Sequence, residues 1–327
     1  MKTQLTQFTG GKTAYPVYLT LGNLPRAIRC KPSQQACILI AYLSVSKMVG
    51  KQLTKKQKST RIQQLFYDSM HIVLDPLIEA GKKGMEVTGG DGKVRIMYPI
   101  LACYVADYPE QCLVTCPKYR TCPKCQVSDD EMGEREAAGW RTQRRTSKLI
   151  CIAREKVTSI SNFQELCKAD NISGGVCHLF WEDFPHCDIH MGITSDILHQ
   201  LYWGVVKHLE HWCTSLMTTA ELNSCALQVI LCYRALLDFI YMAQYPTHDD
   251  STLQYLTNAL DEFHANKDIL VDLEIRNHFN IPKFHSMLHY DECIHNFGTT
   301  YNYNTEMFEQ FHIDYAKEAW RASNFHN

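Results

Sequence analysis

Short apolar runs near the start of the chain predict strands. Residues 14–24 (AYPVYLTLGNL) and 36–45 (ACILIAYLSV) are rich in β-branched and aromatic side chains and are bounded by glycine and proline. Runs of this length and composition favour buried strands over helices. Residues 85–109 predict a hairpin that turns at the glycine-rich run from Gly89 to Gly92 and continues into a strand ending at Asp107.

Apolar residues at helical spacing dominate the rest of the chain. Residues 61–84 predict a helix that closes on two glycines, and the pattern from about 151 to 280 is mostly helical. Residues 126–150 are charged and poor in apolar side chains, which predicts a surface linker. An amphipathic helix is expected from Asn304 onward. This order of elements indicates an α/β core interrupted by a large, mostly helical insertion.

Composition narrows the class of protein. The chain has 327 residues, more than a typical single domain, and a formal net charge of −2, so contact with nucleic acid requires local basic patches. Its 15 cysteines are too sparse for a disulfide scaffold, and no apolar leader follows Met1. We therefore expect reduced thiols and an intracellular protein. No apolar stretch is long enough to cross a bilayer, which argues against a membrane role.

Four residues far apart in sequence have the spacing of metal ligands. Cys122 and Cys125 form a CxxC pair, and His285 and His289 lie four apart in KFHSMLH, where a helix would put both on one face. Together they predict one closed, structural zinc site. Each half alone has an ordinary alternative, since a CxxC can be a redox pair and an HxxxH can be two exposed helix histidines.

An acid lies just outside each half of this set: Asp107 in VADYPEQ and Glu309 in the last helix. A zinc ion that joins the two halves would bring these acids into one neighbourhood. Glu306, one turn before Glu309, is the reserve because both face nearly the same side of the helix. The alternatives are a turn-capping role for Asp107 and a solvated helix face for the two glutamates.

Basic residues gather in two places, residues 47–61 (including Lys55, Lys56 and Lys58) and residues 140–148. Either patch could hold DNA phosphates, in which case binding would weaken as salt rises. The alternative is an ordinary solvated loop. Neither patch contains a base-reading motif, so no sequence specificity is predicted.

The order of these motifs supports a family resemblance. The runs KTAYPVYLTLGNLPRAIRCKPS, YPILACYVADYPEQCLVTC with CPKC, FPHCDIHMGITSDILHQLYWGVVK and YNYNTEMFEQFHIDYAKEAWRASN span nearly the whole chain. They closely resemble the Plavaka-type transposases of fungi, relatives of the CACTA-like cut-and-paste DNA transposases. The resemblance implies an RNase H-like core, a DDE acid triad and CxxC, Asp-x-x-His and HxxxH motifs. It implies a nuclear or intracellular protein.

Carried over by position, the resemblance makes Asp107 the second catalytic acid and Glu309, with Glu306 in reserve, the final one. Asp196 and His199 in SDILHQL match the Asp-x-x-His motif. On its residues alone, His199 would be a hydrogen-bonded core histidine, because apolar residues surround it in the sequence. The resemblance implies that the acids hold Mg²⁺ or Mn²⁺ and that the Cys2His2 set holds Zn²⁺.

The predicted domain limits follow from the same match. Residues 1–125 would form the first part of the RNase H-like core, residues 126–280 the linker and helical insertion, and residues 281–327 the part that completes the core. In relatives the first catalytic aspartate precedes the KTQLT segment, which here begins at Lys2. We therefore expect a copy truncated at both ends.

Two function classes follow. The first is a DDE-type transposase domain that cuts and joins DNA at transposon ends and target sites, working as a homo-oligomer with DNA. Without the first acid, this chain alone is expected to be inactive. The second is a non-catalytic, zinc-stabilised remnant that binds DNA or protein.

Overall fold

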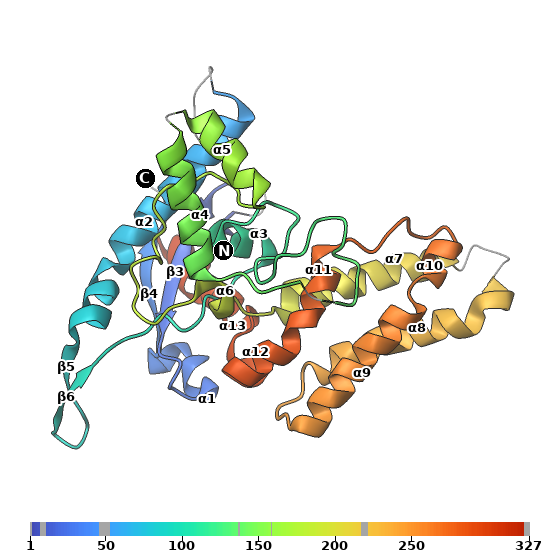
Figure 1. Ribbon diagram of the computed structural model, residues 1–327. Helices are drawn as coiled ribbons and strands as arrows, with labels where there is room; N and C mark the ends of the chain where they lie inside the picture. The colour runs from blue at the N-terminus through green and yellow to red at the C-terminus, as the bar shows by residue number, and fades with distance from the viewer. Residues whose placement is uncertain are drawn as a thin grey trace.

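The computed structural model describes residues 2–6, 11–45, 53–136, 138–157, 159–216 and 222–323 (Figure 1). Its strands form three antiparallel pairs, and no larger sheet is found within these ranges. The pairs are β1 (Thr3–Gln4) with β2 (Thr13–Ala14), β3 (Pro16–Thr20) with β4 (Cys37–Tyr42), and β5 (Met85–Thr88) with β6 (Val94–Met97). The predicted α/β class is compatible with this mixture, whereas the RNase H-like core stays a prediction.

The strand predictions are confirmed except for one. β3 and β4 fall in the two predicted runs, and the β5–β6 hairpin turns at Gly89 to Gly92, where Gly92 has the positive φ of 75° that favours glycine. The predicted strand ending at Asp107 is wrong. Residues 98–107 have no regular structure beyond an isolated parallel bridge between Tyr104 and Ile193, because no neighbouring strand offers them a full ladder.

The predicted helix over 61–84 is part of the longer α2 (Lys55–Lys83). Thr54 and Gln57 form a capping box at its start, and the chain leaves the helix at Gly84, whose φ is 77°. Gly81 stays helical, and a Cβ there would lie 2.9 Å from the Pro99 carbonyl oxygen. Gly81 therefore allows the Pro99 segment to pack closely against α2, and it does not end the helix.

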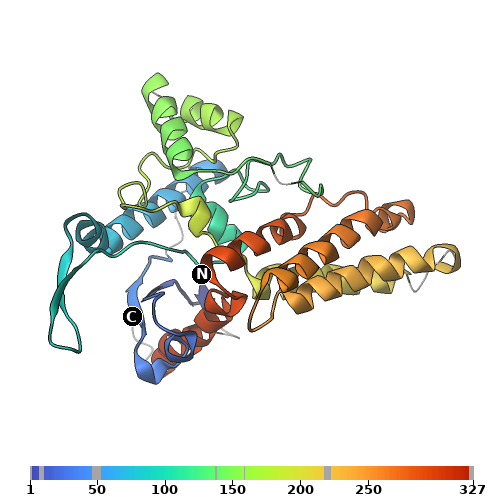
Figure 2. The same ribbon diagram turned by 60° about the horizontal axis from the view of Figure 1, so that its bottom comes forward.

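The middle of the chain is helical, as predicted. The long pair α8 (Leu222–Met242) and α9 (Asp250–Asn266) projects to one side of the molecule in both views (Figures 1 and 2). The other helices before residue 281 are α1 (Arg26–Arg29), η1 (Pro32–Gln34), α3 (Tyr108–Thr115), α4 (Gln143–Lys156), α5 (Ile160–Ala169), α6 (Ile189–Gly192), the π-helix η2 (Ile197–Val206), α7 (Lys207–Leu216) and α10 (Ile269–Asp272).

The surface linker predicted over 126–150 is wrong at its end. α4 begins at Gln143, where the Thr142 hydroxyl accepts a hydrogen bond from the Arg145 amide. Thr146 and Ile150 are buried one helical turn apart, so this charged stretch has an apolar face that the composition hid.

The last segment contains short helices in close succession. They are α11 (Pro282–His285), η3 (Ser286–His289), α12 (Tyr290–Phe297), η4 (Thr300–Asn302), α13 (Glu306–Phe311), the π-helix η5 (His312–Lys317) and α14 (Glu318–Ala322). Met307 and Phe311 of α13 pack on Cys37 of β4, with Tyr18 of β3 against them. The end of the chain therefore lies on its beginning, which positions Glu309.

Two larger cores hold the rest together. The first gathers α2 side chains such as Tyr67 and Met70 around Trp181, whose indole nitrogen donates to the Val114 carbonyl at 2.7 Å. The second packs α7, α8, α9 and α12 around Trp212 and Tyr290. Within the described part of the chain no helix is long and apolar enough to span a bilayer. The domain limits at 125 and 280 stay predictions.

Candidate functional site

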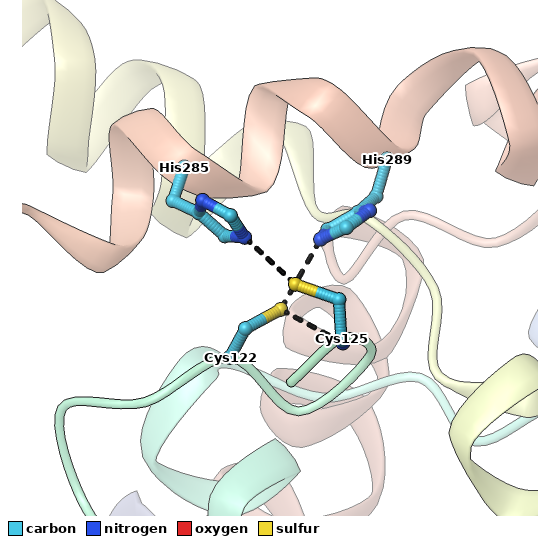
Figure 3. Close-up of side chains that lie close together, drawn as sticks. All are labelled: Cys122, Cys125, His285 and His289. Atoms are coloured by element: carbon cyan, nitrogen blue, oxygen red, sulfur yellow. Dashed lines mark hydrogen bonds between the residues drawn. The ribbon is translucent and has the colours of Figure 1, made fainter. Parts of the chain in front are cut away.

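The four predicted zinc ligands form one buried cluster. Their ligand atoms all lie within 4.8 Å of one another, and all four side chains are at most 2% exposed. Cys122 Sγ lies 3.1 Å from His289 Nε2, and Cys125 Sγ lies 3.1 Å from His285 Nε2. Figure 3 shows both imidazoles directed from one helical segment toward the two sulfurs.

These distances fit a shared ion. A tetrahedral Zn²⁺ with ordinary Zn–S and Zn–N bonds would separate each sulfur from each nitrogen by about 3.6 Å, half an ångström more than in the structure. Hydrogen bonding from Cys122 and the two histidines lowers the pKa of Cys125, while burial raises the pKa of Cys122. The set therefore favours one thiolate before any metal is bound, and a divalent ion would favour the second.

Buried cations fix the CPKC loop from outside the ligand set. Arg141 Nε donates to the carbonyl oxygens of Cys122 and Cys125, both at 2.9 Å. Arg141 is only 5% exposed, so neither the DNA-binding surface nor the solvated loop considered for residues 140–148 describes it. Lys124 Nζ donates to the Ile193 carbonyl at 3.0 Å and lies 3.5 Å from Glu292 of α12. The loop is thus tied to both halves of the chain.

His190 is a supporting residue that the sequence reasoning missed. Its Nδ1 donates to the Pro123 carbonyl at 2.7 Å, and its Nε2 accepts from the Thr146 hydroxyl at 2.8 Å. Burial lowers the pKa of His190 to about 4, so the ring is neutral at physiological pH. The surrounding run DIHMG matches no pattern that would have indicated this role in the sequence.

Asp107 stands at the start of α3 and caps it. Its Oδ1 accepts from the Glu110 amide at 3.1 Å, which is the capping role considered as an alternative to catalysis. Gln111 of α3 donates to the carbonyls of Ala106, at 2.8 Å, and Thr194, at 2.9 Å. Through Gln111, the Asp107 segment is joined to the segment that precedes Asp196.

Asp196 and His199 form a hydrogen-bonded pair at the start of the π-helix η2. Asp196 is fully buried and accepts from His199 Nδ1 at 2.8 Å and from the Thr305 hydroxyl at 2.7 Å. The His199 side chain is hydrogen-bonded, as the alternative of a core histidine expected, but it is 28% exposed. Thr305, one residue before α13, is a second supporting residue that the sequence did not indicate.

The structure separates the two candidate glutamates. Glu309 Oε1 lies 4.0 Å from His199 Nε2, and its Oε2 lies 3.3 Å from Nδ1 of the buried His312. Glu306 Oε2 instead accepts from the Asn304 side chain at 3.0 Å. Glu309 is therefore the glutamate that shares the neighbourhood of His199.

Electrostatic interactions couple the protonation of Asp107, His199 and Glu309. Burial by itself lowers the pKa of His199, but the hydrogen bond and charge of Asp196, with the charges of Asp107 and Glu309, raise it overall. Burial raises the pKa of Asp107, and the His199 charge opposes this effect. The hydrogen bond from His312 lowers the pKa of Glu309. Asp196 thus contacts the His199 imidazole directly, and the charges of Asp107 and Glu309, from two other chain segments, act on the same ring.

The sequence match agrees with this assembly. A family described as Plavaka transposase matches residues 2–213, well over half of the 327 residues. The chain belongs to the Plavaka transposase family. The match includes both cysteines of the metal cluster, Asp107 and His199, whereas the cluster histidines and Glu309 lie beyond it. No curated protein and no solved structure matches the chain significantly.

Transposases act on DNA, so membership of the Plavaka family implies DNA as a partner. Residues 47–52 of the first basic patch lie outside the described ranges, and Lys56 at the start of α2 lies 3.6 Å from Glu165 of α5. In the second patch Arg144, Arg145 and Lys148 of α4 line a hollow of about 440 Å³. Their role in binding phosphates stays a prediction.

Proposed function

We propose that this Plavaka chain forms the catalytic domain of a CACTA-like, DDE-type transposase, in which Asp107 and Glu309 hold catalytic Mg²⁺ or Mn²⁺. The observation that carries the proposal is the 4.0 Å approach of His199 Nε2 to Glu309 Oε1, with the charge of Asp107 acting on the same imidazole. Carboxylates are the hard oxygen ligands that these ions prefer, and two such ions would stabilise the attacking and leaving oxygens of a phosphodiester.

His199 has a defined part in this proposal. Its Nδ1 is occupied by Asp196, which fixes the ring and leaves Nε2 facing Glu309. A protonated Nε2 can donate to a non-bridging oxygen of the scissile phosphate and offset the charge that develops there. Asp196 and Thr305 orient this imidazole and do not touch the DNA in the proposal.

The Cys2His2 cluster serves the same proposal as a structural zinc site. It joins the CPKC loop, which follows α3 and its cap Asp107, to the η3 segment that precedes the Glu309 helix. All four positions are filled by protein ligands, and structural zinc sites are closed in this way. The zinc would therefore hold the acids' supports in place and take no part in the chemistry.

The proposal retains the finer architecture inferred from the family. Residues 1–125 and 281–327 would contribute the RNase H-like core and residues 126–280 the linker and insertion. The DNA substrates would be transposon ends and target sites, so the protein would act in the nucleus. It would work there as a homo-oligomer.

Metal-dependent nicking of a supercoiled plasmid tests the function. The assay compares this chain with one extended before Lys2 by the segment that carries an aspartate in relatives, each in Mg²⁺, Mn²⁺ and Ca²⁺. We expect nicking in Mg²⁺ or Mn²⁺ from the extended chain and its loss in Asp107→Asn. Robust nicking by the unextended chain would refute the three-acid assignment, and no nicking by either chain would favour the non-catalytic alternative.

A further inference from the structure

Trp203 is an exposed tryptophan on the helix that carries the candidate catalytic histidine. Its side chain is 66% exposed, and within the described ranges its indole makes no ring contact or hydrogen bond. Its neighbour Tyr202 differs, because the Tyr202 hydroxyl donates to the side-chain oxygen of Gln244, two residues after α8. A single exposed aromatic residue is common on protein surfaces, so exposure alone implies nothing.

The residues beside Trp203 on the helix suggest a ligand for its exposed indole. Trp203 follows His199 by four residues in the π-helix η2, and Lys207 follows by four more, so the three occupy neighbouring positions along one side of the helix. Lys207 is exposed. An imidazole, an indole and an ammonium group are thus arranged in a row that begins at the acidic site.

A second lysine reaches this row from α11. Lys283 Nζ donates to the Trp203 carbonyl oxygen at 3.2 Å, and its side chain lies across Gly204, where an added Cβ would overlap the lysine stem. The absence of a side chain at residue 204 makes room for this cation.

We propose that Trp203 and Lys283 bind an unpaired nucleotide next to the scissile phosphate. The indole would stack on the base, and the Lys283 ammonium would bind its phosphate, while His199 and the acids act on the neighbouring phosphodiester. Stacking tolerates any base and requires that the base leave the duplex, which an exposed indole permits and a flat basic surface does not. This inference rests on the proposed DNA-cleaving function and names the part of the substrate that the site holds.

Binding measured without divalent metal tests this inference separately from cleavage. Fluorescein-labelled duplexes with a three-nucleotide single-stranded overhang and blunt duplexes of equal length are titrated in EDTA and followed by anisotropy. We expect the protein to bind the overhang duplex about tenfold more tightly, the effect of one stacked base. Trp203→Ala should remove this preference, Trp203→Phe should keep most of it, and Tyr255→Ala, at an exposed tyrosine of α9, should leave it unchanged.

Salt dependence distinguishes the two partners of the nucleotide. Lys283→Ala should weaken binding and reduce the slope of log affinity against log salt by about one, whereas Trp203→Ala should leave this slope unchanged. Gly204→Ala should behave like Lys283→Ala, because the new methyl group displaces the lysine. An overhang preference that survives in Trp203→Ala would overturn the inference even if the protein nicks DNA. Absence of nicking by the extended chain would refute the proposed function and leave this measurement intact.

Discussion

The Cys2His2 cluster and the acidic site differ in almost every physical respect. The cluster is closed, with four buried donors directed at one point. The acidic site is open, because the His199 side chain is 28% exposed and that of Glu309 is 39% exposed. One arrangement supplies a complete ligand shell for an ion, and the other leaves room for substrate and solvent. Stability and reactivity are thus expected to depend on different residues in this protein.

The supports of the two sites show the same contrast. Buried Arg141 and His190 bond backbone carbonyls of the CPKC loop, and Lys124 of the loop donates to the Ile193 carbonyl, which fixes the ligands firmly. In the acidic site the firmly held residue is Asp196, one layer behind the reactive groups. The buried Asp196 therefore orients the His199 ring through Nδ1, while Nε2 of His199 stays accessible.

The largest expected effect is loss of the zinc cluster. Cys122→Ser should abolish stoichiometric zinc and lower the melting temperature by about 10 °C or more, since structural zinc supplies several kcal/mol of folding free energy. Elemental analysis and thermal unfolding measure both, with Cys151→Ser on α4 as the matched control. A metal-free protein of unchanged stability would show that the cluster is an ordinary buried contact.

Removal of an acid should affect activity while sparing the fold. In the extended chain, Asp107→Asn and Glu309→Gln should each reduce nicking about 100-fold or more, corresponding to about 2.7 kcal/mol of transition-state stabilisation. Asparagine preserves the α3 cap, so melting should change little. Glu306→Gln is the control. If nicking falls with Glu306→Gln and persists with Glu309→Gln, the final acid is one turn earlier.

A smaller effect, on stability rather than on metal content, should follow from Thr305→Val in the support of the acidic site. The fully buried Asp196 carboxylate would lose its 2.7 Å hydrogen bond, at a cost of about 1–3 kcal/mol in unfolding free energy. Urea denaturation measures the loss, and Thr305→Ser should restore the wild-type value because it keeps the hydroxyl. A valine variant of wild-type stability together with a destabilised serine variant would point to methyl packing instead.

The smallest effect is expected at the surface of α2. Reversing Lys55, Lys56 and Lys58 to glutamate should weaken DNA binding several-fold and reduce its salt dependence, because Lys56 is already paired with Glu165. Binding isotherms at several salt concentrations give both quantities. Reversal of Lys82 and Lys83 at the far end of the helix provides the control, and equal effects at both ends would indicate charge alone.

Spacing in the sequence was enough to predict which four side chains form the Cys2His2 cluster. CxxC and HxxxH each fix two donors locally, one through a tight turn and the other through one helical turn, so only their meeting remained to be shown. The β5–β6 hairpin and most of α2 were predicted for a similar reason, because glycine turns and the helical spacing of apolar residues act over a few positions.

Other features depended on contacts between distant segments. Arg141 belonged by composition to a basic patch, yet the fold buries it against the CPKC carbonyls. Glu306 and Glu309 were equivalent by helical periodicity, and only the position of His199 separates them. Periodicity specifies which face of a helix a residue occupies, whereas what lies opposite that face is decided by how other chain segments pack against it.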